Sequence, residues 1–122
     1  MEKRKVLIVD DDAQIRIGMN ARLRASGYET AFAQDCVAAV STALREKPDA
    51  ILLDIGLPGG DGFLVLKRLQ ANSNLAHIPV IIVTAREPDQ NEKRALESGA
   101  VAFFQKPVEN DELLSTLSDL IP

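Results

Sequence analysis

The chain has 122 residues, of which 46% are hydrophobic, so length and composition predict one folded domain, residues 1–122, with a packed core rather than disorder. Its formal net charge of -4 argues against a surface that binds nucleic acid directly, because such surfaces concentrate Lys and Arg. No apolar run reaches the length of a membrane span and no apolar leader follows Met1, so we expect a cytoplasmic protein without a membrane partner.

Short apolar and β-branched runs alternate with helical patterns along the chain, which is typical of right-handed strand-helix-strand units and a parallel sheet. The first run is apolar throughout, as expected for a central strand that is covered on both faces, whereas the second is weaker and suits an edge. The predicted strands are residues 5–9, 28–33, 50–53, 79–83 and 101–104.

Five helices are predicted from apolar residues that recur every three or four positions. The first begins near Ala13, and Asp35 can cap the second, which ends at Lys47-Pro48. The fourth has Pro88 in its first turn but little apolar surface, so we expect it to be loosely held. The residues predicted to face the core, helix by helix, are Ile15, Met19 and Leu23; Val37, Val40 and Leu44; Phe63, Leu66 and Leu69; Ala95 and Leu96; and Leu113, Leu117 and Leu120.

Every predicted strand except the second ends in polar side chains that can bind phosphate or a metal ion: Asp10, Asp11, Asp54, Thr84 and Lys106. The carboxyl ends of parallel strands share one edge of a sheet, so we expect these five side chains to converge on one crevice. Each has an ordinary explanation alone, as a helix cap, a loop residue, a strand residue or a surface lysine. Their joint placement favours a site that binds a hard cation and takes up a phosphoryl group.

Three consecutive aspartates, Asp10 to Asp12, follow the first strand, and a helix cap accounts for only one of them. Carboxylates about 4 Å apart repel by roughly 4 kcal/mol at an effective dielectric constant of about 20, so adjacent ones need a cation or a raised pKa. Mg²⁺ suits such oxygen ligands. Asp54 would be a third carboxylate at the same ion and a nucleophile that forms an acyl phosphate, while Lys106 suits holding a phosphoryl oxygen.

Five motifs occur in a characteristic order: Val9-Asp10-Asp11-Asp12, Leu53-Asp54-Ile55-Gly56-Leu57-Pro58, Asp61-Gly62, Thr84-Ala85 and Lys106-Pro107. With them, the chain resembles the response-regulator receiver domain of two-component signalling from Lys5 to Ile121. The resemblance implies an α/β, flavodoxin-like, doubly wound (βα)5 fold, with a parallel five-stranded sheet in the order 2-1-3-4-5.

The resemblance also assigns roles to single residues. The phosphoryl group would come from a histidine of a partner histidine kinase or histidine phosphotransfer protein. The implied roles are phosphoacceptor for Asp54; Mg²⁺ ligands for Asp10, Asp11, Asp54 and the backbone carbonyl of Gly56; phosphoryl contacts for Thr84 and Lys106; and an aromatic switch for Phe103.

A receiver of this kind is not an enzyme acting on other substrates, and it would catalyse only its own phosphorylation and dephosphorylation. Phosphorylation would change the surface of the fourth helix, fifth strand and fifth helix for a downstream protein or an effector domain outside this chain, and a phosphorylation-dependent dimer is a further option. Gly56 and Arg86 occupy flanking positions that influence the phosphate lifetime in the family, and the sequence does not fix the sign of their effect here.

Two other interpretations stay open at this point. Asp10 to Asp12 also fits the Asp-x-Asp motif of haloacid-dehalogenase-type Mg²⁺-dependent phosphatases, with Asp10 as nucleophile and Thr84 and Lys106 as later motifs. That family requires a further acidic pair after a strand beyond the lysine, whereas only a helix is predicted there, and Asp54 would have no role. The third interpretation is a docking module that is not phosphorylated.

Overall fold

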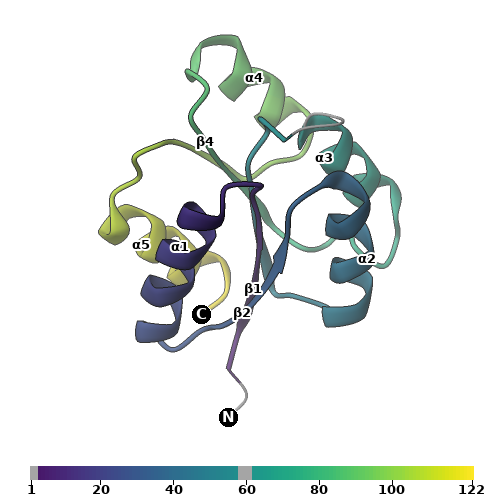
Figure 1. The fold of residues 1–122 in the computed structure, drawn as a ribbon. Helices are drawn as coiled ribbons and strands as arrows, with labels where there is room; N and C mark the ends of the chain where they lie inside the picture. The colour runs from purple at the N-terminus through teal and green to yellow at the C-terminus, as the bar shows by residue number, and fades with distance from the viewer. Residues whose placement is uncertain (1–2, 58–61) are drawn as a thin grey trace.

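The computed structural model describes residues 3–57 and 62–122, and within them five parallel strands form one sheet. The strands lie in the order β2-β1-β3-β4-β5, which confirms the predicted doubly wound α/β fold, with the first strand inside the sheet and the second at its edge. Figure 1 shows the sheet in the middle of the molecule with helices on either side. The bounds of the strands differ from the predicted ones by at most one residue at each end. The strands are β1 (Lys5–Val9), β2 (Glu29–Ala33), β3 (Ala50–Leu53), β4 (Val80–Thr84) and β5 (Ala102–Gln105).

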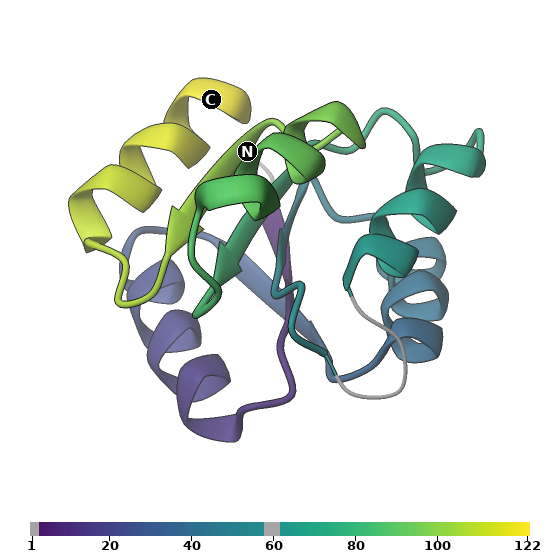
Figure 2. The same ribbon diagram turned by 90° about the horizontal axis from the view of Figure 1, so that it is seen from above.

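Helices cover both faces of the sheet (Figure 2). One face carries α1 (Ala13–Ala25) and α5 (Asn110–Leu120), and the other carries α2 (Cys36–Glu46), α3 (Gly62–Ala71) and α4 (Asp89–Glu97). Successive strand side chains point to opposite faces, so Leu7 and Val9 pack in the α2–α4 core while Val6 and Ile8 pack in the α1–α5 core. In the described part of the chain, no helix combines the length and the apolar character needed to cross a membrane.

The predicted buried face of α2 is wrong. Val37 is 72% exposed and Leu44 is 41% exposed, and only Val40 of the predicted set packs against the core, at its margin. The buried face instead presents small residues, with Ala39 and Ala43 almost fully enclosed. Small side chains let this helix approach the sheet closely, and the larger Val37 and Leu44 do not fit on that side.

The α4 helix has little apolar contact with the core, as predicted. Ala95 is fully buried, but Leu96 is 45% exposed, so the prediction that Leu96 docks the helix is wrong. A second contact comes from the Arg94 guanidinium, which lies over the Phe63 ring of α3 at 3.8 Å from its centroid. One alanine and one cation–π contact are a weak anchor for a helix, since such a contact contributes about 0.5–1 kcal/mol at an exposed site.

The α5 helix packs through Leu113 and Leu117 as predicted, but not through Leu120, which is 36% exposed. Ile121 lies just after the helix and is buried in its place. Ile121 follows Leu117 by four residues, and its N–H donates to the carbonyl of Leu117 at 2.8 Å, so it continues the buried stripe of the helix where Leu120 does not.

Candidate functional site

The carboxyl ends of the strands meet at one edge of the sheet, where backbone hydrogen bonds hold neighbouring ends in register. The N–H of Asp54 donates to the carbonyl of Val9 at 3.0 Å, and the N–H of Lys106 donates to the carbonyl of Thr84 at 2.7 Å. These bonds extend the strand pairing by one residue, to the polar positions. Of the five side chains predicted to converge, the structure places Asp10, Asp11, Asp54 and Lys106 in one cluster.

Three carboxylates form the centre of the cluster. Asp10, Asp11 and Asp54 each offer an oxygen within 4.8 Å of the other two. Asp10 and Asp54 are buried and Asp11 is exposed, so the group opens to solvent on one side. Asp12 caps α1 instead, where its Oδ1 accepts from the N–H of Gln14 at 2.8 Å. The helix cap and the acidic site therefore use different members of the aspartate run.

Lys106 reaches this group across the sheet edge. Its Nζ donates to Oδ2 of Asp10 at 2.7 Å and to Oδ2 of Asp54 at 3.2 Å. One ammonium group is shared between two buried carboxylates, and Asp11 adds a third negative charge. The cluster therefore carries more negative than positive charge.

The pKa values of two of these groups are shifted, each by a balance of burial and neighbouring groups. Burial raises the pKa of Asp10 above its ordinary 3.8 and outweighs the hydrogen bonds from Lys106 and from the N–H of Asp12. Burial alone would lower the pKa of Lys106, but the hydrogen bond to Asp10 and the charge of Asp54 outweigh it, so that pKa is raised above 10.5. Lys106 thus stays protonated, while the charge on Asp10 remains unfavourable without a further cation.

The donor atoms suit a hard divalent cation. All three acidic side chains offer carboxylate oxygens, the ligands that Mg²⁺ prefers, and the excess of negative charge favours a cation there. After Asp54 the chain turns back on itself, and the N–H of Gly56 donates to Oδ1 of Asp54 at 2.8 Å. This turn keeps the Gly56 backbone beside the carboxylates, and the role of its carbonyl as a ligand stays a prediction.

Thr84 and Phe103 are not among the side chains that the structure groups in the cluster. Thr84 ends β4 and is fully buried, and its Oγ1 accepts from the backbone N–H of Arg86 at 3.2 Å. Phe103 is on the neighbouring strand β5, paired with Ile82 and half-buried against the core that α4 covers. The hydroxyl and the aromatic ring thus lie on adjacent strands, and their roles stay predictions.

Gly62 is a site residue whose importance the sequence did not reveal beyond its place in a motif. A Cβ atom built on it would lie 2.4 Å from Cα of Ile55 and 2.6 Å from the carbonyl oxygen of Asp54. The first turn of α3 therefore rests directly on the backbone that follows the acidic strand end, and only glycine fits there. Pro58 and Asp61, which belong to two of the quoted motifs, lie outside the described residues.

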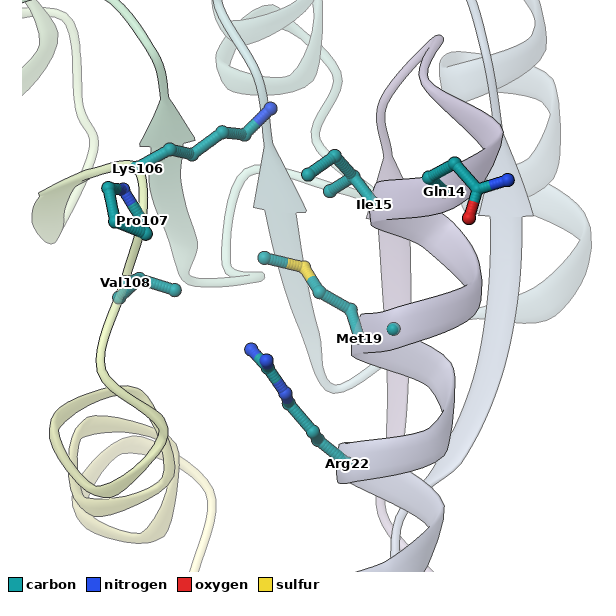
Figure 3. Close-up of a pocket in the computed structure, with 8 residues that line it drawn as sticks. Gln14, Ile15, Met19, Arg22, Lys106, Pro107 and Val108 are labelled. Atoms are coloured by element: carbon teal, nitrogen blue, oxygen red, sulfur yellow. The ribbon is translucent and has the colours of Figure 1, made fainter.

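A cavity of about 370 Å³ opens beside the acidic site, between α1 and the segment that follows β5 (Figure 3). The aliphatic stem of Lys106 runs along it, and the amino group points away from Val108. No sequence pattern predicts this cavity, because it depends on how α1 and the Pro107 segment face each other. Its lining residues are Gln14, Ile15, Gly18, Met19, Arg22, Lys106, Pro107 and Val108.

Family models and curated proteins both match this chain over most of its length. The family model of the response regulator receiver domain matches residues 6–118. Response regulator PleD of Caulobacter vibrioides is 38% identical over 117 residues, which cover 95% of this chain and 26% of PleD. The chain spans half or less of the length of such curated relatives.

Solved structures of similar proteins share the fold over nearly the whole chain. Chemotaxis protein CheY4 of Vibrio cholerae superposes with a TM-score of 0.91 at 28% identity, over 98% of this chain and 100% of that one. The receiver domain of sensor histidine kinase PA1611 of Pseudomonas aeruginosa PAO1 superposes with a TM-score of 0.89 at 30% identity, over 98% of both chains. The latter structure has a magnesium ion coordinated in its active-site cleft.

Proposed function

Because this chain belongs to the response regulator receiver domain family, which acts in two-component signalling, we propose that Asp54 is its phosphoacceptor. The observation that carries the proposal is the position of the Asp54 carboxylate, which is grouped with two further carboxylates and hydrogen-bonded to the Lys106 ammonium. A carboxylate can attack a phosphoryl group only where cations offset their mutual repulsion. This edge of the sheet supplies one cation and the ligands for another.

The proposed reaction is a direct transfer from a phosphohistidine. A carboxylate oxygen of Asp54 attacks phosphorus, so that a P–O bond forms while the P–N bond of the donor breaks. The imidazole nitrogen keeps the electron pair of the broken bond, and the donor leaves as a histidine. Lys106, which already bonds Asp54, would hold one phosphoryl oxygen, and the Thr84 hydroxyl would donate to another.

Asp10, Asp11 and Asp54 would hold Mg²⁺, together with the backbone carbonyl of Gly56. The bound ion would neutralise phosphoryl charge and align the attacking and leaving groups. The all-carboxylate donor set and the raised pKa of Asp10 support this assignment, since both indicate a site that gains from a hard cation. The protein would thus catalyse its own phosphorylation and dephosphorylation and no reaction on another substrate.

The donor would be a histidine kinase or a histidine phosphotransfer protein. Ile15, Met19 and Val108 form apolar parts of the cavity that ends at Lys106 (Figure 3), next to the acidic site. A protein donor seated on this face would bring its histidine close to Asp54. This proximity supports a protein rather than a free metabolite as the natural donor.

Phosphorylation would change the surface formed by α4, β5 and α5, and a partner would bind this surface. The Thr84 hydroxyl now accepts a hydrogen bond from Arg86, in the segment that leads to α4. If Thr84 turns toward the phosphoryl group, that segment changes and Phe103 gains room on the α4 side of the sheet. The weak anchoring of α4 makes it the element most easily repacked.

Residues 1–122 would form one receiver domain in the cytoplasm. Its output would go to a downstream protein or to an effector domain outside this chain, and neither nucleic acid nor a membrane would be bound directly. A phosphorylation-dependent dimer is a third form of output. Sedimentation velocity with and without beryllofluoride, which mimics a phosphoryl group on a carboxylate, separates a dimer from a monomer.

The direct test is incubation of the protein with acetyl phosphate and Mg²⁺, followed by mapping of the modified residue by mass spectrometry. We expect one phosphoryl group on Asp54 and none in Asp54→Asn. A label on Asp10 with Asp54 unmodified would favour the phosphatase interpretation instead. A folded protein that takes no label would favour a docking module.

A further inference from the structure

Arg86 lies beside the acidic site on the side where Gly56 has no side chain. A Cβ atom built on Gly56 would be 3.3 Å from Oδ1 of Asp54 and 3.8 Å from Nε of Arg86. The carboxylate and the guanidinium therefore both border the space that a side chain at position 56 would occupy. The missing side chain of Gly56 leaves that space open between them.

The backbone conformation at position 56 does not require glycine. The structure records a positive φ for Gly27 and Gly99 but not for Gly56, so another residue could adopt the backbone there. What glycine provides at this position is room. A longer side chain would occupy the space that joins Asp54 to Arg86.

The two oxygens of Asp54 face different cations. Oδ2 accepts from the Lys106 ammonium, whereas Oδ1 accepts from the N–H of Gly56, on the side where Arg86 lies. The Arg86 guanidinium makes no hydrogen bond or ion pair with the rest of the described chain, and its side chain is exposed. Its backbone is fixed close by, because its N–H donates to Thr84 Oγ1 at 3.2 Å. Arg86 is thus an available cation on the side that Lys106 does not reach.

The phosphorylated site would keep a net negative charge that the Arg86 guanidinium can balance. A phosphoryl group carries a charge of about -1.5 to -2 near neutral pH. Asp10 and Asp11 add two negative charges, while a divalent ion and Lys106 supply three positive ones. Up to about one negative charge remains, and a guanidinium offers both the balancing charge and a fork of N–H donors for phosphoryl oxygens.

We propose that Arg86 is a further phosphoryl-binding residue of this receiver, and that the absence of a side chain at Gly56 gives it access. The proposal rests on the proposed function, since it requires a phosphoryl group on Asp54. In it, Lys106 and Arg86 hold the phosphoryl group from opposite sides of the Asp54 carboxylate. Arg86 also links the modified site directly to the segment that leads into α4.

The test is calorimetric titration of the whole chain with beryllofluoride in saturating Mg²⁺. We expect Arg86→Ala to weaken binding by about tenfold, the effect of losing one charge-assisted hydrogen bond at a partly exposed site. Arg86→Lys should keep part of the affinity, because a charge is retained. The matched control is Arg45→Ala, which removes the same charge from an exposed arginine at the end of α2 and should bind like the parent.

The outcomes separate this inference from the proposed function. If the parent binds beryllofluoride and Arg86→Ala binds equally well, the inference is overturned and the phosphoacceptor function stands. If the parent, folded and loaded with Mg²⁺, binds none, the proposed function itself fails. Equal losses in Arg86→Ala and Arg45→Ala would mean that net charge alone matters, which also overturns the inference.

A double-mutant cycle tests the part played by Gly56. Gly56→Asn places a side chain in the space between Asp54 and Arg86, so we expect Arg86→Ala to have little further effect on beryllofluoride affinity in that background. The same tenfold loss in both backgrounds would show that access does not depend on Gly56. Circular dichroism of each variant confirms that the fold is retained.

Discussion

At the scale of single residues, the acidic site is defined by charges that the protein alone does not balance. Asp10 has a raised pKa because burial outweighs its hydrogen bonds, and Lys106 has a raised pKa because nearby carboxylates outweigh its burial. Lys106 is shared between Asp10 and Asp54, and Asp11 adds a third carboxylate to the group. The metal-free site is therefore electrostatically unfavourable at neutral pH, and a divalent ion would relieve this.

We predict that Asp10→Asn raises the melting temperature of the metal-free protein at pH 7 and abolishes its stabilisation by Mg²⁺. A carboxyl group whose folded pKa is raised stabilises the fold fully below its unfolded value, near 3.8, and loses that contribution as pH rises through the folded pKa. The difference between variant and parent should therefore shrink as pH falls toward 3.8. Melting curves in EDTA across this range measure it, and a variant less stable than the parent at pH 7 would contradict the prediction.

Gly62 gives a second prediction at this scale. A methyl group there would meet the backbone of Ile55 at 2.4 Å, so Gly62→Ala should reduce the free energy of unfolding by about 2–4 kcal/mol. The matched control is Gly18→Ala on α1, where a Cβ atom meets nothing within 4 Å. That change should stabilise the helix by about 0.5–1 kcal/mol. Urea unfolding compares the two, and equal effects would argue against a close approach of α3.

At the scale of elements, α4 is the part of the fold with the weakest hold on the core. Ala95 and the Arg94–Phe63 contact secure it, and Phe103 lies beneath it on β5. We predict that beryllofluoride and Mg²⁺ change the amide hydrogen exchange of α4 in the parent protein. In Phe103→Ala, beryllofluoride should still bind but the exchange of α4 should no longer respond to it. The same response in both proteins would contradict a switching role for Phe103.

Sequence patterns predict the strands of this fold better than they predict which face of a helix is buried. Apolar and β-branched runs predict all five strands, and the signal is strongest for β1, β3 and β4, which are buried on both faces. The buried face of α2 was missed, because the pattern of large residues does not reveal that Ala39 and Ala43 pack instead. Helix faces depend on how closely the neighbouring layers approach, and that distance is set by the tertiary structure.

In the site, too, the grouping of residues at the strand ends is predictable from the sequence, whereas contacts that depend on tertiary packing are not. Parallel strands place their carboxyl ends at one edge of the sheet, which predicts that Asp10, Asp54 and Lys106 lie together. The structure groups them there. The contact of Gly62 with the backbone and the space shared by Gly56 and Arg86 depend on loop paths. No spacing in the sequence encodes such close approaches, because they are set by the tertiary structure.

At the scale of the whole molecule, the site ties together strands that belong to both cores. Its groups follow β1, β3 and β5, and these strands pack helices on each face of the sheet. An ion held by Asp10, Asp11 and Asp54 would link the ends of β1 and β3, and it would stabilise the folded state by about 2.7 kcal/mol at a concentration one hundred times its Kd. The charge imbalance at one edge thus connects metal binding to overall stability.

The central claim is that the carboxylate cluster makes Asp54 reactive by binding a divalent ion. The most direct measurement is the fraction of protein phosphorylated at Asp54 by acetyl phosphate, determined by intact mass and peptide mapping as the Mg²⁺ concentration rises. We predict a saturable increase in the parent, almost no product in EDTA, and a strongly reduced response in Asp10→Asn. Equal phosphorylation of Asp54 in EDTA and in Mg²⁺ would contradict the claim.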